Sequence, residues 1–334
     1  MVTINDIARK ANVSKSTVSK VINDYYGVNE ETKKKVLKVM RENNYWPNAV
    51  ARSLSTNKSF IIGMFVPGRL NNFFFREVIR GIEEVCGQKG YDLLYFTNER
   101  WDDKNVNFSY VEKCHNRNVD GVMLMGFGDV DGSQFDKLVE SDNPSVFIDN
   151  DREGNNTSYL VSDNRGGAAK AVKYLHSLGH EKIGIITGPR GLKPAQDRLI
   201  GLKKTVKELG LQCKSDWIFH ADYNIAEKKG YEIIQKFLDM DTRPTAIFAE
   251  DMFLIGAIKR LEEKGLSIPD KFSFVGFDNI ELSEHYKLTT ISQNKIGMGR
   301  SAARLLLSII DGEEYSSVTL PTELVERESC RKIK

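Results

Sequence analysis

The sequence predicts an α/β protein in which an N-terminal helix-turn-helix headpiece and a short hinge helix precede two lobes of doubly wound parallel sheet. Three observations support this prediction. The first 46 residues contain three short helical patterns, with a tight turn after the first. A short helix-prone segment and a polar linker occupy residues 47–59. From residue 60 onward, apolar strand patterns alternate with amphipathic helical patterns, which is typical of parallel sheets covered on both faces.

The headpiece begins with an apolar face at helical spacing. The residues that share this face are Ile4, Ile7, Ala8 and Ala11. Ser14 is a suitable N-cap for a second helix over residues 15–22, and Asn29 is one for a third helix over about residues 31–43. Two helices joined by a three-residue turn and supported by a third form the helix-turn-helix arrangement.

Charge is divided unevenly along the chain. Residues 1–60 contain eleven lysines and arginines against five acidic residues, a surplus of +6, and since the whole chain carries +2 the remaining residues carry −4. A small basic head on a mildly acidic body is expected when only the head meets a polyanion. An ordinary solvated surface is the alternative that charge alone leaves open.

Cysteine spacing and hydropathy argue against several other classes. The four cysteines share no C-x-x-C spacing; they are Cys86, Cys114, Cys213 and Cys330. This pattern favours reduced thiols in a cytosolic protein over a zinc site, and we expect neither a metal nor a cofactor. The sequence has no apolar leader and no apolar run of about 18 residues, so we expect a cytoplasmic protein without a membrane segment.

The hinge and the body complete the predicted organisation. Residues 48–54 are helix-prone but too few to be stable alone. We therefore divide the chain into a headpiece at 1–46, a hinge helix and linker at 47–59, and a two-lobed domain at 60–334.

The body contains eight strand patterns and seven helical patterns. The strand patterns lie at residues 60–66, 92–97, 121–125, 145–148, 182–186, 217–220, 246–249 and 272–277. The helical patterns lie at about residues 74–88, 104–116, 164–178, 197–209, 225–238, 253–264 and 296–310. Eight strands are many for one small sheet, so we expect two lobes, with a ligand crevice at the carboxyl ends of their strands.

Short motifs follow one another along the whole chain. In the headpiece and hinge they are Thr3-Ile4-x-Asp6-Ile7-Ala8-x-x-Ala11-x-Val13-Ser14-x-x-Thr17-Val18-Ser19 and Tyr45-x-Pro47-Asn48-Ala49-Val50-Ala51-Arg52-Ser53-Leu54. In the body they are Gly63-x-x-Val66-Pro67, Asp120-Gly121, Ser162-Asp163-Asn164, Leu178-Gly179-His180, Arg198-x-x-Gly201-Leu202, Arg243-Pro244-Thr245-Ala246-Ile247-Phe248, Gly276-Phe277-Asp278 and Leu320-Pro321. In this order they resemble the LacI/GalR family of bacterial transcriptional regulators, which implies a periplasmic-binding-protein-like body.

The resemblance implies that the second helix of the headpiece reads double-stranded operator DNA. Its outward residues are Lys15, Ser16, Thr17 and Lys20. Hydroxyl groups can bond base edges in the major groove, and lysines can reach guanine or phosphate. A homodimer would meet a pseudo-palindromic operator, with an affinity that falls steeply with salt. The alternative is that these residues are solvated positions of a packing helix.

The resemblance further implies that paired hinge helices, one from each subunit, lie in the minor groove. Asn48, Ala51 and Leu54 would contact DNA there, with Leu54 wedged between base steps so that the duplex bends. The alternative is that Leu54 packs against the headpiece.

The resemblance places an effector pocket between the two lobes. The matching residues are Phe74, Phe75, Asp149, Asn150, Arg198, Tyr223, Glu250 and Asp278. Arg198 would supply a rigid fork of donors, and the aromatic residues would stack on a ring. Phe73 stands where a proline is usual, with an extra residue upstream, and Glu250 stands where an asparagine is usual. The alternatives are that the phenylalanines are ordinary core, that Arg198 is a surface residue at a helix start, and that Glu250 faces solvent.

Three carboxylates, one arginine and stacking aromatics suit the apolar face and vicinal hydroxyls of a sugar. We therefore expect a sugar or oligosaccharide effector, with a nucleobase as the alternative. More remote alternatives are a carbohydrate-active enzyme that uses Glu250 and Asp278, and a sugar-binding transport protein. Neither explains a basic headpiece.

Effector binding is expected to shift the lobes and so the spacing of the paired hinge segments, with a sign that the sequence does not reveal. The chain has no heptad extension after Leu320-Pro321, so we expect a dimer and not a tetramer.

Shortening Leu54 tests the minor-groove wedge. Leu54→Ala should weaken operator binding and reduce DNA bending without changing ligand affinity, because only the apolar wedge is lost. A gel phasing assay measures the bend, and equal bending by wild type and variant would contradict the hypothesis.

Overall fold

The computed structural model describes residues 2–22, 25–46, 58–66, 72–96, 109–126 and 133–333. The chain divides into two units, Met1–Phe60 and Ile61–Lys334. The hinge residues Asn48, Ala51 and Leu54 lie outside the described ranges. Among the helices within those ranges, none is long and apolar enough to cross a lipid bilayer.

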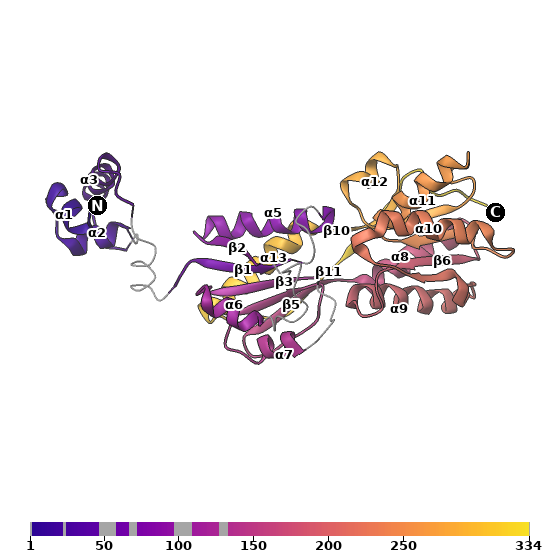
Figure 1. Cartoon of the computed structure of the whole chain (residues 1–334), viewed down its shortest axis with the longest axis horizontal. Helices are drawn as coiled ribbons and strands as arrows, with labels where there is room; N and C mark the ends of the chain where they lie inside the picture. Colours follow the sequence, from indigo (N-terminus) through magenta and orange to yellow (C-terminus); the bar gives the residue numbers. More distant parts are fainter. Residues whose placement is uncertain are drawn as a thin grey trace, which may run out of the picture. The chain divides into compact units, whose positions relative to one another are not determined.

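Three short helices make up the first unit (Figure 1): α1 (Ile4–Ala11), α2 (Lys15–Ile22) and α3 (Glu30–Glu42). Ser14 caps α2 by accepting the N–H of Thr17 at 3.0 Å, and Asn29 caps α3 by accepting the N–H of Thr32 at 2.8 Å. All three helices contribute to one core, whose buried members are Ile7, Ala8, Ala11, Val18, Val21, Val36 and Met40. The predicted helices and both predicted caps are confirmed.

The second unit contains two six-stranded sheets, one in each lobe. The first sheet has the order β11-β5-β4-β3-β1-β2, with β1 (Ile61–Phe65), β2 (Asp92–Phe96), β3 (Gly121–Met125), β4 (Ser145–Ile148), β5 (Thr157–Ser162) and β11 (Val318–Leu320). The second has the order β12-β10-β9-β8-β6-β7, with β6 (Ile183–Thr187), β7 (Ile218–His220), β8 (Ala246–Ala249), β9 (Ser273–Asp278), β10 (Thr289–Gln293) and β12 (Thr322–Val325). Neighbouring strands are parallel except for β10 and β12.

Helices cover the sheets, and their apolar faces build the cores. The first lobe carries α5 (Phe73–Gln88), α6 (Tyr110–Asn116), α7 (Ser133–Val139) and α13 (Lys295–Asp311). The second lobe carries α8 (Asn164–Ser177), α9 (Lys193–Glu208), α10 (Ala226–Asp239), α11 (Asp251–Glu263) and the short α12 (Glu281–His285). Figure 1 shows α8 and α9 on one side of the second sheet and α10 and α11 on the other, and each pair closes a separate apolar cluster. The central strands are buried along their whole length, as doubly covered sheets require.

The chain crosses between the lobes three times. It passes from β5 to α8 at Asp163, from β10 to α13 at Asn294, and from β11 to β12 at Pro321. As a result α8 packs on the second sheet, whereas α13 returns to the first sheet and lies along α5. The junction between the lobes is therefore built from three chain segments that are distant in sequence.

The structure contains strands that the apolar pattern did not predict. They are β5, β10, β11 and β12. The sequences of β5 and β10 contain buried Ser and Thr, and these hydroxyls are accommodated by hydrogen bonds such as that between Ser145 and Thr157 at 2.7 Å. Polar strands of this kind look like loops to a hydropathy pattern, which is why they were missed.

Helices α5 and α13 approach closely at two glycines. A Cβ added at Gly299 of α13 would collide with the carbonyl oxygen of Val78, and one added at Gly81 of α5 would collide with the carbonyl oxygen of Ile296. Glycine at both positions lets the two backbones touch, so this contact fixes α13 to the first lobe.

Adding a methyl group at this contact should destabilise the body. Gly299→Ala should lower the free energy of unfolding by about 1–3 kcal/mol, because backbone cannot yield as a side chain can. Gly87→Ala, at a site in α5 with no atom within 4 Å of the added Cβ, is the control and should be neutral or stabilising. Equal midpoints of both variants in urea unfolding would refute the close contact.

Candidate effector site and nucleic-acid interface

The outer face of α2 carries the residues that the sequence assigns to DNA. Lys15, Ser16 and Lys20 are exposed and Thr17 is half-buried. The hydroxyl of Ser14 lies 2.7 Å from that of Ser16 and 2.8 Å from that of Thr17. The cap thus orders both hydroxyl groups beside two exposed lysines, an arrangement suited to base edges and phosphate oxygens.

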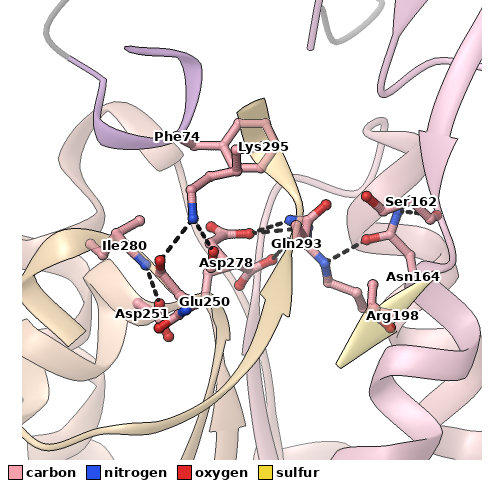
Figure 2. Close-up of polar contacts among 12 residues, drawn as sticks. Phe74, Ser162, Asn164, Arg198, Glu250, Asp251, Asp278, Ile280, Gln293 and Lys295 are labelled. Atoms are coloured by element: carbon pink, nitrogen blue, oxygen red, sulfur yellow. Dashed lines mark hydrogen bonds and ion pairs between the residues drawn. The ribbon is translucent and has the colours of Figure 1, made fainter. Parts of the chain in front are cut away.

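A buried arginine forms the centre of the second candidate site. The Arg198 Nε donates to Asn164 Oδ1 at 2.9 Å and its Nη1 donates to Glu250 Oε1 at 2.7 Å, while Nη2 reaches Asp278 Oδ1 at 3.5 Å (Figure 2). The guanidinium carbon also lies 3.9 Å from the ring centroid of Phe277. Burial lowers the pKa of Arg198, but the neighbouring carboxylates outweigh this and hold the pKa above its ordinary value.

The prediction that Arg198 lies at the start of its helix is wrong. Helix α9 begins at Lys193, with Pro194 in its first turn, and Arg198 follows in the second turn. Its side chain is 5% exposed. This excludes the alternative of a surface arginine.

Glu250 precedes α11, where the buried strand β8 ends. Its Oε1 accepts hydrogen bonds from three groups: the Tyr223 hydroxyl at 2.6 Å, Arg198 at 2.7 Å and the Thr187 hydroxyl at 3.3 Å. The residue is 4% exposed, so the alternative that Glu250 faces solvent is wrong. Burial and the Glu250 carboxylate raise the pKa of Tyr223, which therefore stays a hydrogen-bond donor.

Asp278 ends β9 with a left-handed backbone, φ +103°. Its Oδ1 accepts the amide N–H of Gln293 at 2.7 Å in addition to the contact with Arg198. Burial raises the pKa of the Asp278 carboxyl to about 6, against the opposing effect of Arg198.

Asp251 is the first residue of α11 and is fully buried. It accepts the backbone N–H of Ile280 at 3.1 Å and the hydroxyls of Ser283 at 2.6 Å and Thr290 at 2.7 Å. Burial raises the pKa of Asp251 to about 7. These bonds tie the segment after Asp278 to α11 and β10.

Asp149 follows β4 and supplies the contribution of the first lobe. It is buried, with φ +62°, and Asn150 beside it is half-buried. Burial raises the pKa of Asp149 to about 6, and the charge of Arg198 acts against this rise. The charges of Asp149 and Arg198 therefore interact across the two lobes, whereas Glu250 and Asp278 contact Arg198 directly.

The predicted aromatic residues are also buried or half-buried. Phe74 and Phe75 open α5 with their rings edge to face, 5.3 Å apart between centroids. The Phe75 ring lies against Gly126, the residue that follows β3. A Cβ added at Gly126 would collide with this ring. Burial of both rings agrees with an effector wall and equally with ordinary core.

Four buried side-chain oxygens have no hydrogen-bond partner within the described part of the chain. They are Asp149 Oδ1, Ser162 Oγ, Glu250 Oε2 and Gln293 Oε1. Glu250 contacts Arg198, and Gln293 donates to Asp278 of the same cluster. Asp149 interacts with Arg198 through its charge, and the carbonyl of Ser162 accepts from Asn164, which itself accepts from Arg198. Buried polar groups without partners are rare and costly, and in the described part of the chain these four gather around one buried arginine.

Sequence reasoning missed several members of this cluster. Asn164 was noted only as part of a motif, and Gln293 ends the polar strand β10, which was not predicted. Lys295 begins α13 and donates to the backbone carbonyls of Asp278 and Asn279. The available signal was position, because each of these residues lies at or next to a crossover between the lobes.

The raised pKa of Asp149 gives a pH-dependent stability. Its folded-state pKa of about 6 exceeds the ordinary 3.8, so the folded protein binds the proton more tightly and loses stability as pH rises from about 4 to 6. Asp149→Asn removes this loss, and the variant should gain about 3 kcal/mol relative to wild type between pH 4 and pH 7. Urea unfolding across this range measures the gain. Exposed Asp142→Asn is the control, and a gain that does not vary with pH would contradict the assignment.

Comparison with known proteins agrees with this organisation. The family model "Bacterial regulatory proteins, lacI family" matches residues 3–48, and the "Periplasmic binding protein-like domain" model matches residues 172–330. The HTH-type transcriptional repressor PurR of Aliivibrio salmonicida is 34% identical over 100% of both chains, and that of Pasteurella multocida is 36% identical over 99% of both.

Solved structures agree as well. The lac repressor dimer bound to operator and the anti-inducer ONPF is 28% identical, with a TM-score of 0.81 over 99% of each chain. The complex of the transcriptional regulator CelR with cellobiose is 25% identical, with a TM-score of 0.72 over 98% of this chain and 100% of that one. These relatives are transcription regulators and not enzymes. The chain belongs to the LacI family and is a DNA-binding transcriptional repressor.

Proposed function

We propose that a small polar ligand bound at the Arg198 cluster sets the affinity of this repressor for its operator. The observation that carries the proposal is the set of four buried oxygens, unpartnered within the described residues, around the buried Arg198. Asp149 comes from the first lobe and Glu250 from the second, so a ligand that bonds both would favour one arrangement of the lobes over others. Such a difference in binding is what shifts a conformational equilibrium.

For the ligand class, we place a nucleobase ahead of the sugar that the sequence favoured. The PurR repressors that match the whole chain weigh toward the nucleobase alternative. The site chemistry is compatible with it, because a guanidinium and carboxylates can address the acceptors and donors on the edge of a planar base. Aromatic rings at Phe74 and Tyr223 could stack on its faces.

A sugar remains the second candidate because of where the free oxygens lie. They belong to four separate positions, after β4, at the end of β5, before α11 and at the end of β10. A ring with hydroxyl donors on several sides would suit such a distribution. The CelR complex with cellobiose adds support for this class.

For the DNA, we propose that two copies of the chain bind one pseudo-palindromic operator, each through Lys15, Ser16, Thr17 and Lys20 of α2. Asn48, Ala51 and Leu54 would contact the minor groove between the half-sites. The exposed lysines of α2 and the operator-bound lac repressor dimer support this arrangement.

A binding panel tests the proposal. Guanine, hypoxanthine, cellobiose and ribose are added to the full chain, ligand affinity is measured by calorimetry, and operator affinity is measured by fluorescence anisotropy on DNA that the protein selects from a random pool. We expect one class to bind and to change operator affinity, which also reveals the sign of the effect.

The matched variants are Glu250→Gln, at the residue before α11, and Glu262→Gln, at an exposed position within α11. Glu250→Gln should weaken ligand binding about tenfold or more, because charge-assisted hydrogen bonds are lost. Glu262→Gln should change nothing. Binding of sugars alone would favour the second candidate, and binding of neither class would overturn the proposed control by these ligands.

A further inference from the structure

Lys295 is a buried charge beside the candidate effector site. It is the first residue of α13, and its side chain is 3% exposed. Its Nζ donates to the carbonyl oxygens of Asp278 and Asn279, both at 2.7 Å, and lies 3.6 Å from Glu77 Oε1. Figure 2 shows the Lys295 side chain pointing toward Asp278. A lysine is rarely buried unless its charge is compensated. Here two carbonyl oxygens accept from its ammonium group and one carboxylate balances its charge.

The two carbonyls that Lys295 binds belong to an unusual stretch of backbone. Asp278 has φ +103° and Asn279 has φ +49°, both in the left-handed region that residues with side chains avoid. Such conformations persist only where the surroundings impose them, and they concentrate at functional sites. On the amide side, Asp251 holds the N–H of Ile280. On the carbonyl side, Lys295 supplies the opposing hold.

Lys295 reaches this stretch from the other lobe. Strand β9, which ends at Asp278, belongs to the second sheet, whereas α13 packs against α5 and the first sheet. The counter-ion Glu77 lies on α5, one turn after Phe74. The contacts from Glu77 through Lys295 to Asp278 form a bridge between the lobes. This bridge joins α5, which carries the predicted aromatic residues, to the end of β9, which carries the predicted ligand-binding aspartate.

We propose that Lys295 is a positioning residue of the effector site, which fixes the backbone of Asp278 and Asn279 to the first lobe with Glu77 as its counter-ion. The aspartate is thereby held toward Arg198 and Gln293 in a lobe arrangement that the bridge stabilises. Without the bridge, the strained strand end would relax and the carboxylate would lose its fixed direction. The proposal rests on the proposed function only in taking Asp278 as a contact of the effector.

The first test needs no ligand. Hydrogen exchange of the full chain, followed by mass spectrometry, reports the opening of residues 279–286. Lys295→Met keeps the length of the side chain and removes its charge and donors, so exchange in this segment should be about tenfold faster. Lys287→Met, at an exposed lysine paired with Glu328 at 2.8 Å, is the matched control and should leave exchange unchanged. Unchanged exchange in Lys295→Met would overturn the proposal.

Two further variants keep the test decisive if Lys295→Met does not fold. Lys295→Arg retains a buried cation with several donors and should restore slow exchange to within about threefold of wild type. Glu77→Gln removes only the counter-ion and should speed exchange by about threefold. Unchanged exchange in Glu77→Gln, together with fast exchange in Lys295→Arg, would show that cation and counter-ion do not matter and would overturn the proposal.

The second test measures ligand binding with whichever of guanine, hypoxanthine, cellobiose and ribose the wild-type protein binds. Lys295→Met should weaken its Kd by about tenfold, and Lys295→Arg should recover most of this loss. An unaltered Kd with altered exchange would restrict Lys295 to a structural role and overturn the positioning of Asp278. If none of the four compounds binds wild type, the proposed ligand classes fail, and the exchange result alone decides the role of Lys295.

Discussion

The body of this repressor depends on the ion cluster around Arg198. A guanidinium excluded from water must be matched by acceptors, and here they come from Asn164 at the start of α8, Glu250 before α11 and Asp278 at the end of β9. Removing the arginine would leave the buried carboxylates of Glu250 and Asp278 without a counter-ion. The cost of such uncompensated charges exceeds the net stabilisation that the intact ion pairs provide. The Arg198 guanidinium therefore holds these element ends of the second lobe together, and the same group would bind the proposed ligand.

The three crossovers suit the control that we propose for this cluster. Asn164, Gln293 and Lys295 lie at or beside the positions where the chain passes between the lobes. We expect a change in the bonding of any of them to alter the direction in which a helix leaves its sheet. The backbones of α5 and α13 touch at two glycines, so we expect such a change to move the two helices together.

Much of this arrangement could be predicted from the sequence, and the failures have physical causes. The caps Ser14 and Asn29 and the alternation of strands and helices were readable because each depends on neighbouring residues. Asp149, Arg198, Glu250 and Asp278 were placed by resemblance. The structure brings Glu250 and Asp278 into contact with Arg198, and Asp149 interacts with Arg198 through its charge. Strand β10 was missed because its threonines are buried through bonds to distant groups such as Asp251. Lys295 was missed because a lysine at a helix start is usually solvated, and its partners lie in other elements.

The headpiece described above encloses its own core, and none of its buried members is shared with the body. Recognition of DNA and the proposed recognition of a small molecule therefore belong to separately packed parts of one gene product. Substitutions that adapt the pocket to a new metabolite need not disturb the reading of the operator, and the reverse holds as well. If the proposed pocket is the input, this separate packing would allow inputs and target sequences to diverge independently.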